Sequence, residues 1–311
     1  MTDIKEGRNV VAVGNSPELQ FGTVVFATDF SWASQNAGSY ASAFSTHFAS
    51  RLVVAHGFLL TQAALEVEVE KPLSSQLRID LYRELTAAAR ALQAGYGKPE
   101  GILLDGDPRK SIAALAHRRS PALVVMGTHG GGAIDRFILG STAEGVLRHC
   151  TQPALTVGPK VRPLAADQLH IRRILYASDC TVEAARGAVI AVEFAKSFSA
   201  ELDLLNVTQS SEGTSPESLP RLQEGFHKAV ESLSPETVRQ VSEQKIFVSV
   251  GQPITTILKH IDERQIDLLI LGLKRSRHLG LHSDTSDAFS IIAKAKCPVL
   301  TVAADSSSHP S

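Results

Sequence analysis

The sequence predicts an α/β protein in which one β-α-β-α-β-α-β-α-β unit occurs twice, each copy a five-stranded parallel sheet flanked by helices. Short apolar runs alternate along the chain with longer stretches of helical spacing, a pattern typical of parallel sheets covered by helices. The runs VVFA, LVVA and LVVM contain no polar residue, as expected of strands buried on both faces. Glycine and proline landmarks of the first copy recur in the second at a constant spacing.

The first copy opens with the β-branched run TVVFA, which predicts a strand, followed by small and apolar residues at helical spacing. Leu77, Leu81 and Leu85 share one face of a long helix, and Pro108 suits the first turn of the helix after the third strand. The expected strands are residues 23–27, 52–58, 102–104, 123–126 and 154–157. The expected helices are residues 33–48, 74–96, 110–118 and a stretch that ends at 149.

The second copy repeats the first with two offsets. Asp179 follows the run ILYA as Asp29 follows VVFA, which is an offset of 150. Later landmarks repeat at an offset of 145, since Gly106 matches Gly251 and Pro153 matches Pro298. We therefore expect a tail (1–20), a first domain (21–158), a linker (159–171), a second domain (172–304) and a tail (305–311).

Composition narrows the class of protein. The net charge of −1 and the pI of about 6.8 argue against nucleic-acid and anionic-membrane binding, which require a basic surface. No apolar run approaches the roughly 18 residues of a membrane span, and the mixed-charge N-terminus does not resemble a secretory signal. Three cysteines without C-x-x-C spacing suit a reducing compartment, so we expect a cytoplasmic protein.

The stretch LVVMGTHGGGAIDRFILGST combines a buried strand, a glycine-rich loop and the start of a helix. Gly127, Gly130 and Gly140 permit either a positive φ or a close backbone approach. Ser141 and Thr142 then open a helix whose first N–H groups and dipole favour an anion such as phosphate. Two ligand-free interpretations stay open: an ordinary strand-to-helix turn, or a capping box between Ser141 and Glu144.

In a parallel sheet of this kind, ligands bind beyond the carboxyl ends of the strands, where the strand order reverses. Asp29 follows the first strand, His56 and Gly57 end the second, and Gly127 ends the fourth. We therefore expect these residues to border one crevice.

A set of motifs resembles the universal stress protein (UspA) family. They are ATDFS, LVVAHGF, DGDP, VVMGTHGG and GSTAEGVL, followed by the proline-led strand PALTV. The resemblance covers nearly the whole chain twice. It implies two tandem Rossmann-like domains of the adenine nucleotide alpha hydrolase-like type, a role in the stress response, and ATP bound through G-x-x-G-x9-G-S/T in the first domain, with Mg²⁺ or Mn²⁺ as an option.

The family pattern implies that eleven residues of the first domain hold the nucleotide, with the Asp29 carboxylate near the ribose or a metal on the phosphates. They are Ala27, Thr28, Asp29, Gly57, Met126, Gly127, His129, Gly130, Gly140, Ser141 and Thr142. Several have structural alternatives: Asp29 as a helix cap and Met126 as core. His56 is better explained as a structural strand-end residue, and Arg136 as a solvated side chain.

The second domain departs from this pattern. At the offset of 145, Gly130 becomes Arg275, Gly140 becomes Thr285 and Thr142 becomes Asp287, while Asp179, Gly272 and Ser286 survive. A carboxylate at the helix start would both cap the helix and repel phosphate. We therefore expect no ATP binding of the usual kind there. The basic cluster Lys274, Arg275, Arg277 and His278 is better explained as a solvated loop than as another anion site.

The sequence carries no convincing catalytic set and no zinc-like spacing, so neither catalytic nor metal-ligating residues are assigned. Asp105 and Asp107 resemble a metal-binding D-x-D, but a turn before Pro108 explains them more simply. A nucleotide-dependent switch or sensor read by an unidentified protein partner is favoured over fast ATP turnover, because no water-activating base or arginine finger is evident. Slow ATP hydrolysis or nucleotidyl chemistry, and an interaction module without nucleotide, remain as alternatives.

The last strand of each copy falls at a sheet edge. Residues 154–157 and 299–302 could pair within one chain and cover both edges, which would make the monomer a built-in dimer. A further homodimer of two chains is compatible with this arrangement.

Overall fold

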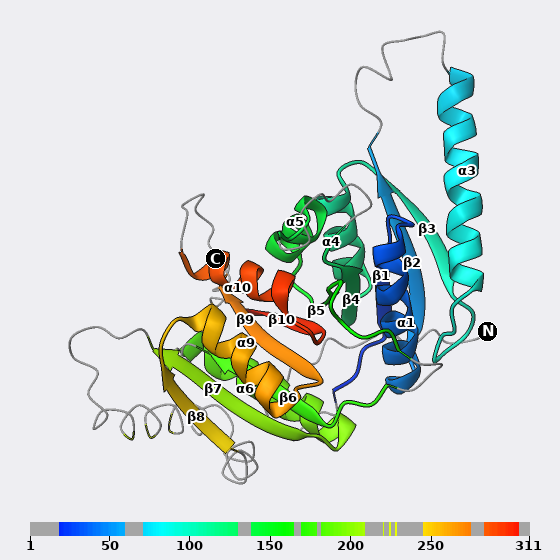
Figure 1. Cartoon of the computed structure of the whole chain (residues 1–311). Coiled ribbons are helices and arrows are strands. Elements are labelled where there is room, and N and C mark those ends of the chain that lie inside the picture. Colours follow the sequence, from blue (N-terminus) through cyan, green and yellow to red (C-terminus); the bar gives the residue numbers. More distant parts are fainter. Residues whose placement is uncertain are drawn as a thin grey trace, which may run out of the picture.

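The fold is described from a computed structural model, in which residues 19–59, 71–129, 138–164, 169–178, 182–208, 220, 224, 228, 245–274 and 283–304 are described. Ten strands form one sheet in the order β3-β2-β1-β4-β5-β10-β9-β6-β7-β8 (Figure 1). The strands of the first half are β1 (Thr23–Ala27), β2 (Arg51–Phe58), β3 (Glu100–Asp105), β4 (Ala122–Gly127) and β5 (Ala154–Val157). Those of the second half are β6 (Arg173–Ser178), β7 (Glu201–Thr208), β8 (Lys245–Val250), β9 (Leu268–Lys274) and β10 (Val299–Ala304).

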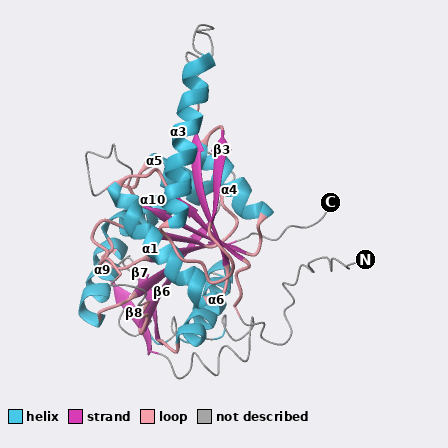
Figure 2. Cartoon of the chain, turned by 90° about the vertical axis from the view of Figure 1, so that its right-hand side faces the viewer, coloured by secondary structure: helices cyan, strands magenta, loops and turns pink. Residues whose placement is uncertain are grey.

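Helices cover both faces of this sheet, as the sequence predicts (Figure 2). The described helices are α1 (Trp32–His47), α3 (Lys71–Arg90), α4 (Pro108–Arg118), α5 (Ser141–His149), α6 (Val182–Phe198), α9 (Pro253–Arg264) and α10 (Ser283–Lys294). Side chains of α1, α3 and α6 pack into one buried cluster, and those of α4, α5, α9 and α10 pack into the other. Strand β1 supplies both, with Val24 and Phe26 on one face and Val25 and Ala27 on the other.

The duplication predicted from the offsets is visible in the elements. β1, α1 and β2 begin 150 residues before β6, α6 and β7, whereas β3, α4 and β5 begin 145 residues before β8, α9 and β10. Within each half all strand pairs are parallel. The prediction of five-stranded parallel sheets flanked by helices is therefore confirmed.

The two halves meet where β5 and β10 pair antiparallel, with Leu155 opposite Leu300. The hydroxyls of Thr156 and Thr301 each donate across this seam to a backbone carbonyl, at 3.1 and 3.0 Å. The predicted pairing of these strands within one chain is therefore confirmed. Both buried clusters continue across the seam, so the halves share their cores.

The expected helix over 74–96 ends earlier, at Arg90. Soon after Arg90 the backbone is held against α1, because the N–H of Gln93 donates to the Ser42 hydroxyl at 3.1 Å and that of Gly95 donates to the Ser45 hydroxyl at 3.0 Å. Smaller shifts affect the helix expected over 33–48, which is α1, and the strand expected over 102–104, which is β3. Among the described helices, none is both long and apolar enough to cross a membrane.

Candidate functional site

The reversal of strand order in the first half lies between β1 and β4. In the register of the sheet, Ala27 stands opposite Ala55 of β2 on one side and Met126 of β4 on the other. The carboxyl ends of these three strands therefore meet at one edge, as the sequence predicts for a ligand crevice.

The loop after β1 is held by its own polar groups. Thr28 is buried, its hydroxyl is hydrogen-bonded to that of Ser34 at 2.9 Å, and it accepts from the N–H of Phe30 at 3.0 Å. Ser31 caps α1 by accepting from the N–H of Ser34. The Thr28 side chain therefore holds the loop at the end of β1.

Asp29 is exposed beside this loop, and it does not cap α1. Its Oδ1 accepts from the N–H of Ser31 at 3.1 Å and from the Ser31 hydroxyl at 2.5 Å. The alternative of Asp29 as the helix cap is wrong, because Ser31 takes that position. These contacts fix the carboxylate at the end of β1.

The end of β2 supports the same loop. The carbonyl of Thr28 accepts from Nδ1 of His56 at 2.8 Å, and the His56 ring stacks on Phe30 with centroids 4.4 Å apart. This structural role is the one expected for His56. At Gly57 a Cβ atom would lie 2.8 Å from Cα of Pro108, so glycine is required here for close packing of β2 on α4.

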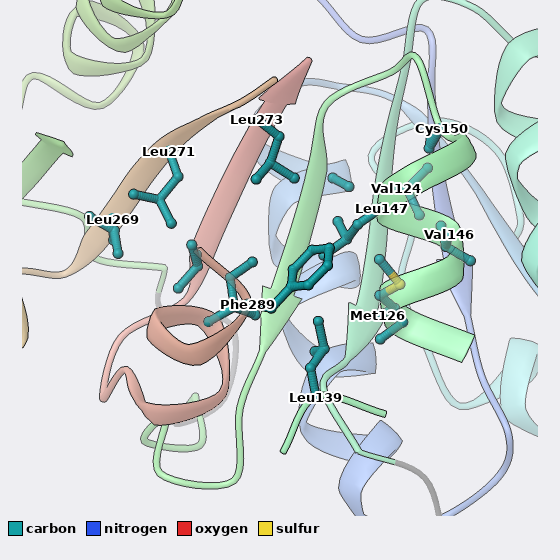
Figure 3. Close-up of a cluster of buried hydrophobic side chains, with 14 of the residues drawn as sticks. Val124, Met126, Leu139, Val146, Leu147, Cys150, Leu269, Leu271, Leu273 and Phe289 are labelled. Atoms are coloured by element: carbon teal, nitrogen blue, oxygen red, sulfur yellow. The ribbon is translucent and has the colours of Figure 1, made fainter. Parts of the chain in front are cut away.

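Most residues around the end of β4 are buried. Met126 is 4% exposed and lies in the cluster with Leu139 and Val146 (Figure 3), so its side chain is core and its backbone borders the crevice. The hydroxyl of Thr128 and Nδ1 of the buried His129 lie 2.7 Å apart. Gly130 and Arg136 fall outside the described residues.

Helix α5 begins beside this loop, with Gly140 as its N-cap. The N–H of Gly140 donates to the carbonyl of Thr128 at 2.8 Å, and no side chain caps the helix. The capping box between Ser141 and Glu144 is therefore wrong: Ser141 is the first helical residue, and the Glu144 carboxylate accepts from Arg148. The first backbone N–H groups of α5 and its positive dipole end therefore lie beside the end of β4, without a side-chain cap.

Gly140 has a φ of −62° and a ψ of 143°, which any residue adopts. A positive φ, one of the two reasons that the sequence offers for this glycine, is therefore excluded. Ser141 and Thr142 are exposed on the first turn of α5. Their N–H and hydroxyl groups are accessible to an anion.

Asp105 and Asp107 lie in a turn before Pro108, which is the interpretation favoured over a metal-binding D-x-D. Asp107 is the N-cap of α4, Pro108 follows at the first helical position, and Gly106 has a φ of +96°. Asp105 accepts from Arg78 at 2.6 Å. Hydrogen bonds from Arg109 lower the pKa of Asp107 to about 2. Among the described residues no group of three His, Cys, Asp or Glu side chains is arranged to hold a metal.

Sequence reasoning assigned no role to Gly145, within the GSTAEGVL motif. The aliphatic part of the Arg109 side chain lies where a Cβ on Gly145 would stand, so α4 and α5 approach each other closely. A glycine in the second turn of a helix was the available signal, because glycine is unfavourable there unless packing requires it.

The second half differs at the corresponding helix. By the offset of 145, Ser286 matches Ser141, but α10 begins three residues earlier, at Ser283. Its first N–H groups are thus displaced by about 4.5 Å along the helix axis. Asp287 is the fifth helical residue, so the expectation that it caps the helix is wrong. Asp179, Arg275, Arg277 and His278 fall outside the described residues.

The model of the universal stress protein family matches this chain twice, over residues 20–158 and 170–303. Curated relatives include a universal stress protein from Thermus aquaticus, 31% identical over 138 residues, which are 44% of this chain and 98% of that protein. Another, from Methanocaldococcus jannaschii, is 24% identical over 158 residues, 46% of this chain and 98% of its own length.

The duplication as a whole has a counterpart among solved structures. A universal stress protein from Archaeoglobus fulgidus aligns with 91% of this chain and 97% of its own, with a TM-score of 0.62 and 22% sequence identity. At that identity the likeness concerns the fold. Taken with the double match of the family model, it shows that this chain belongs to the universal stress protein family as a tandem member.

Proposed function

We propose that the first half binds an adenine nucleotide, ATP, and acts as a nucleotide-dependent switch in the stress response. The observation that carries this proposal is the start of α5, where no side chain caps the helix and Gly140 is hydrogen-bonded to the loop at the end of β4. Such a helix start, at the reversal of strand order, suits a polyphosphate.

The proposed contacts follow from this placement. The backbones of Ala27, Thr28 and Gly57 border the adenosine, and the fixed Asp29 carboxylate faces the ribose or a divalent metal on the phosphates. Met126, Gly127, His129 and Gly130 line the ribose and the inner phosphates, with Met126 contributing backbone alone. Gly140, Ser141 and Thr142 bind phosphate oxygens through N–H and hydroxyl groups.

The second half is proposed not to bind ATP in this way. The earlier start of α10 shifts its first N–H groups, and Asp287 adds a negative charge within the first two turns. The two domains are proposed to span residues 21–158 and 172–304. With a single nucleotide site, the protein would report nucleotide occupancy to a protein partner in the cytosol.

A switch is favoured over an ATPase on the basis of the polar groups near the crevice. The imidazole of His56 and the carboxylate of Asp29 are both engaged by the loop after β1. The imidazole of His129 is buried, and its Nδ1 lies 2.7 Å from the Thr128 hydroxyl. ATP and Mg²⁺ or Mn²⁺, incubated with the protein, should therefore give little ADP over hours.

Two substitutions at Gly140 test the phosphate site. The backbone of Gly140 accepts either Asp or Asn as an N-cap, so both variants should fold with equal or greater stability. Gly140→Asp places a carboxylate where phosphate binds and should abolish ATP binding in calorimetric titration. Gly140→Asn has nearly the same shape without the charge and should retain part of the affinity.

Three outcomes are distinguishable. Loss in Gly140→Asp with retention in Gly140→Asn supports the site. Equal affinity of Gly140→Asp and the wild type contradicts the phosphate placement. Absence of ATP and AMP binding by the wild type, together with no nucleotide extracted from the purified protein, contradicts the proposed function as a whole.

A further inference from the structure

A basic pocket lies at the seam between the two halves. Its volume is about 250 Å³, and it is lined by Lys160, Leu258, Ile261, Asp262, Lys294 and Lys296. Asp262 accepts from the ammonium group of Lys296 at 2.8 Å. Three lysines against one aspartate leave the lining with an excess of two positive charges.

The antiparallel pairing of β5 and β10 gathers these lysines. Lys160 lies three residues after the end of β5, and Lys296 lies three residues before the start of β10. Because Val299 stands opposite Thr156, the end of β5 and the beginning of β10 fall at the same place in the sheet. Lys294 is the last residue of α10, two residues before Lys296, and also lines the pocket.

The same place adjoins the proposed nucleotide site. In the register of β4 and β5, Gly127 stands opposite Val157, and the N–H of Thr128 donates to the carbonyl of Val157 at 3.1 Å. A Cβ on Gly158 would lie 3.6 Å from the Thr128 hydroxyl and 3.7 Å from the carbonyl oxygen of Ala295. Gly158 is thus in contact with the crevice loop on one side and with the end of α10 on the other.

The lateral separation between the two sites is small. β4, β5 and β10 are consecutive strands, so the end of β4 and the start of β10 are two strand spacings apart, about 10 Å. Ala295, whose carbonyl approaches Gly158, stands between Lys294 and Lys296 in the sequence. The second half therefore brings Lys294 and Lys296 near the end of β4, where the nucleotide site is proposed.

We propose that the seam pocket is a phosphate-binding subsite to which the second half contributes Lys294 and Lys296. The negative end of the α10 dipole and Asp262 offset about one and a half elementary charges, so the pocket lining as a whole keeps a positive formal charge. The apolar side chains of Leu258 and Ile261 line the pocket beside the lysines and reduce competition from water.

The phosphate groups have two possible sources. They are either the outer phosphates of a nucleotide bound in the first half, an assignment that rests on the proposed function, or a separate inorganic phosphate or polyphosphate. In the first case the second half, with its altered crevice, serves as a selectivity element that favours ATP over AMP. In the second case it is an independent anion site.

The test compares the full-length wild type with Lys294→Gln/Lys296→Gln. A matched control, Lys98→Gln/Lys259→Gln, removes two exposed lysines that do not line the pocket. Each protein is titrated calorimetrically with ATP, AMP and sodium tripolyphosphate at constant ionic strength. Lys294→Arg/Lys296→Arg, which keeps both charges, should restore binding, and urea unfolding checks that all variants are folded.

If the outer phosphates of ATP occupy the pocket, the glutamine pair lowers ATP affinity at least about tenfold, the change that one hydrogen bond to a charged group supplies, and leaves AMP affinity unchanged. If the anion is separate, tripolyphosphate binds the wild type with and without AMP, and the glutamine pair weakens that binding by a similar factor. Affinities for ATP and tripolyphosphate that match those of the control overturn the proposal.

These outcomes separate the subsite from the nucleotide site. A wild type that binds tripolyphosphate through Lys294 and Lys296 but binds neither ATP nor AMP contradicts the proposed function and supports the pocket. A wild type that binds ATP with equal strength in all variants, and shows no tripolyphosphate binding, contradicts the pocket alone.

Discussion

Gly57 shows how a single residue is fixed by a distant contact. It lies near the end of β2, and Cα and Cβ of Pro108 at the start of α4 occupy the space around it. The Cα is backbone and the Cβ belongs to the proline ring, which is closed onto the backbone, so neither atom can rotate away from an added methyl group.

We expect Gly57→Ala to lower the free energy of unfolding by about 1–3 kcal/mol, because overpacking against backbone must displace β2 or α4. Gly22→Ala is the matched control, since a Cβ there has Pro121 O as its nearest neighbour, at 3.7 Å, and it should change stability by about 0.5 kcal/mol or less. Urea unfolding followed by far-UV circular dichroism measures both. Equal stability of the two variants would contradict the packing argument.

At the scale of elements, equivalent strands and helices of the two halves are built with different chemistry. In the first half, Val53 of β2 and Leu115 of α4 are buried apolar residues. Their counterparts by the two offsets are Asp203 of β7 and His260 of α9, which lie 3.3 Å apart. Arg264 completes the group by donating to the same carboxylate at 3.0 Å.

Asp203, His260 and Arg264 satisfy one another's hydrogen bonds. Changing Asp203 alone should therefore lower the free energy of unfolding more than replacing Asp203 and His260 together by apolar residues. Asp203→Asn leaves a buried polar side chain whose N–H₂ group faces the donors of His260 and Arg264, and it should lower the free energy of unfolding by about 1–3 kcal/mol. In the double variant no polar group remains at these two positions, and the Arg264 side chain, 32% exposed, can turn to solvent. Asp203→Val/His260→Leu copies the pair in the first half and should lie within about 1 kcal/mol of the wild type or above it. Chemical denaturation at pH 7 tests the order, and a double variant less stable than the single one would refute it.

The same carboxylate gives the molecule a defined response to acid. Burial raises the pKa of Asp203, but hydrogen bonds from His260 and Arg264 outweigh it, so the pKa lies below the usual value. A lowered folded-state pKa contributes stability above the unfolded value, about 4, which is lost as the pH falls through the folded value. The stability gap between wild type and Asp203→Asn should therefore shrink below about pH 4. Denaturation curves at pH 7, 5, 4 and 3 measure it, and a constant gap would exclude this mechanism.

At the scale of the whole molecule, the halves are joined by more than one strand pair. On one face of the sheet, the ring of His47 at the end of α1 stacks on that of Phe198 at the end of α6, with ring centroids 3.9 Å apart. On the other face, the guanidinium of Arg148 lies 4.9 Å from the ring centre of Phe289, which Figure 3 shows among the shared core residues. The two copies therefore share one folded body.

This sharing predicts a single unfolding transition for the chain, with equal calorimetric and van't Hoff enthalpies. Phe198→Ala removes part of the seam and should lower the stability of the whole by about 2–3 kcal/mol without splitting the transition. Differential scanning calorimetry of both proteins is the measurement. Two resolved transitions in the wild type would show that the halves fold independently.

The sequence alone predicted the parallel sheets, most of their strands and the duplication. These features follow from local signals, since uninterrupted apolar runs such as VVFA mark buried strands and shared offsets mark repeats. The reversal of strand order between β1 and β4, where we propose the nucleotide site, agrees with the expectation that a ligand would bind at such a point.

The tertiary structure decided what each residue does at that edge. Ser31 rather than Asp29 caps α1, Met126 is core, and Gly57 is required by Pro108. The cluster around Asp203 and the lysines at the seam were also not evident from sequence. Each of these depends on contacts between residues far apart in the chain, which carry no periodicity or spacing that a single sequence could reveal.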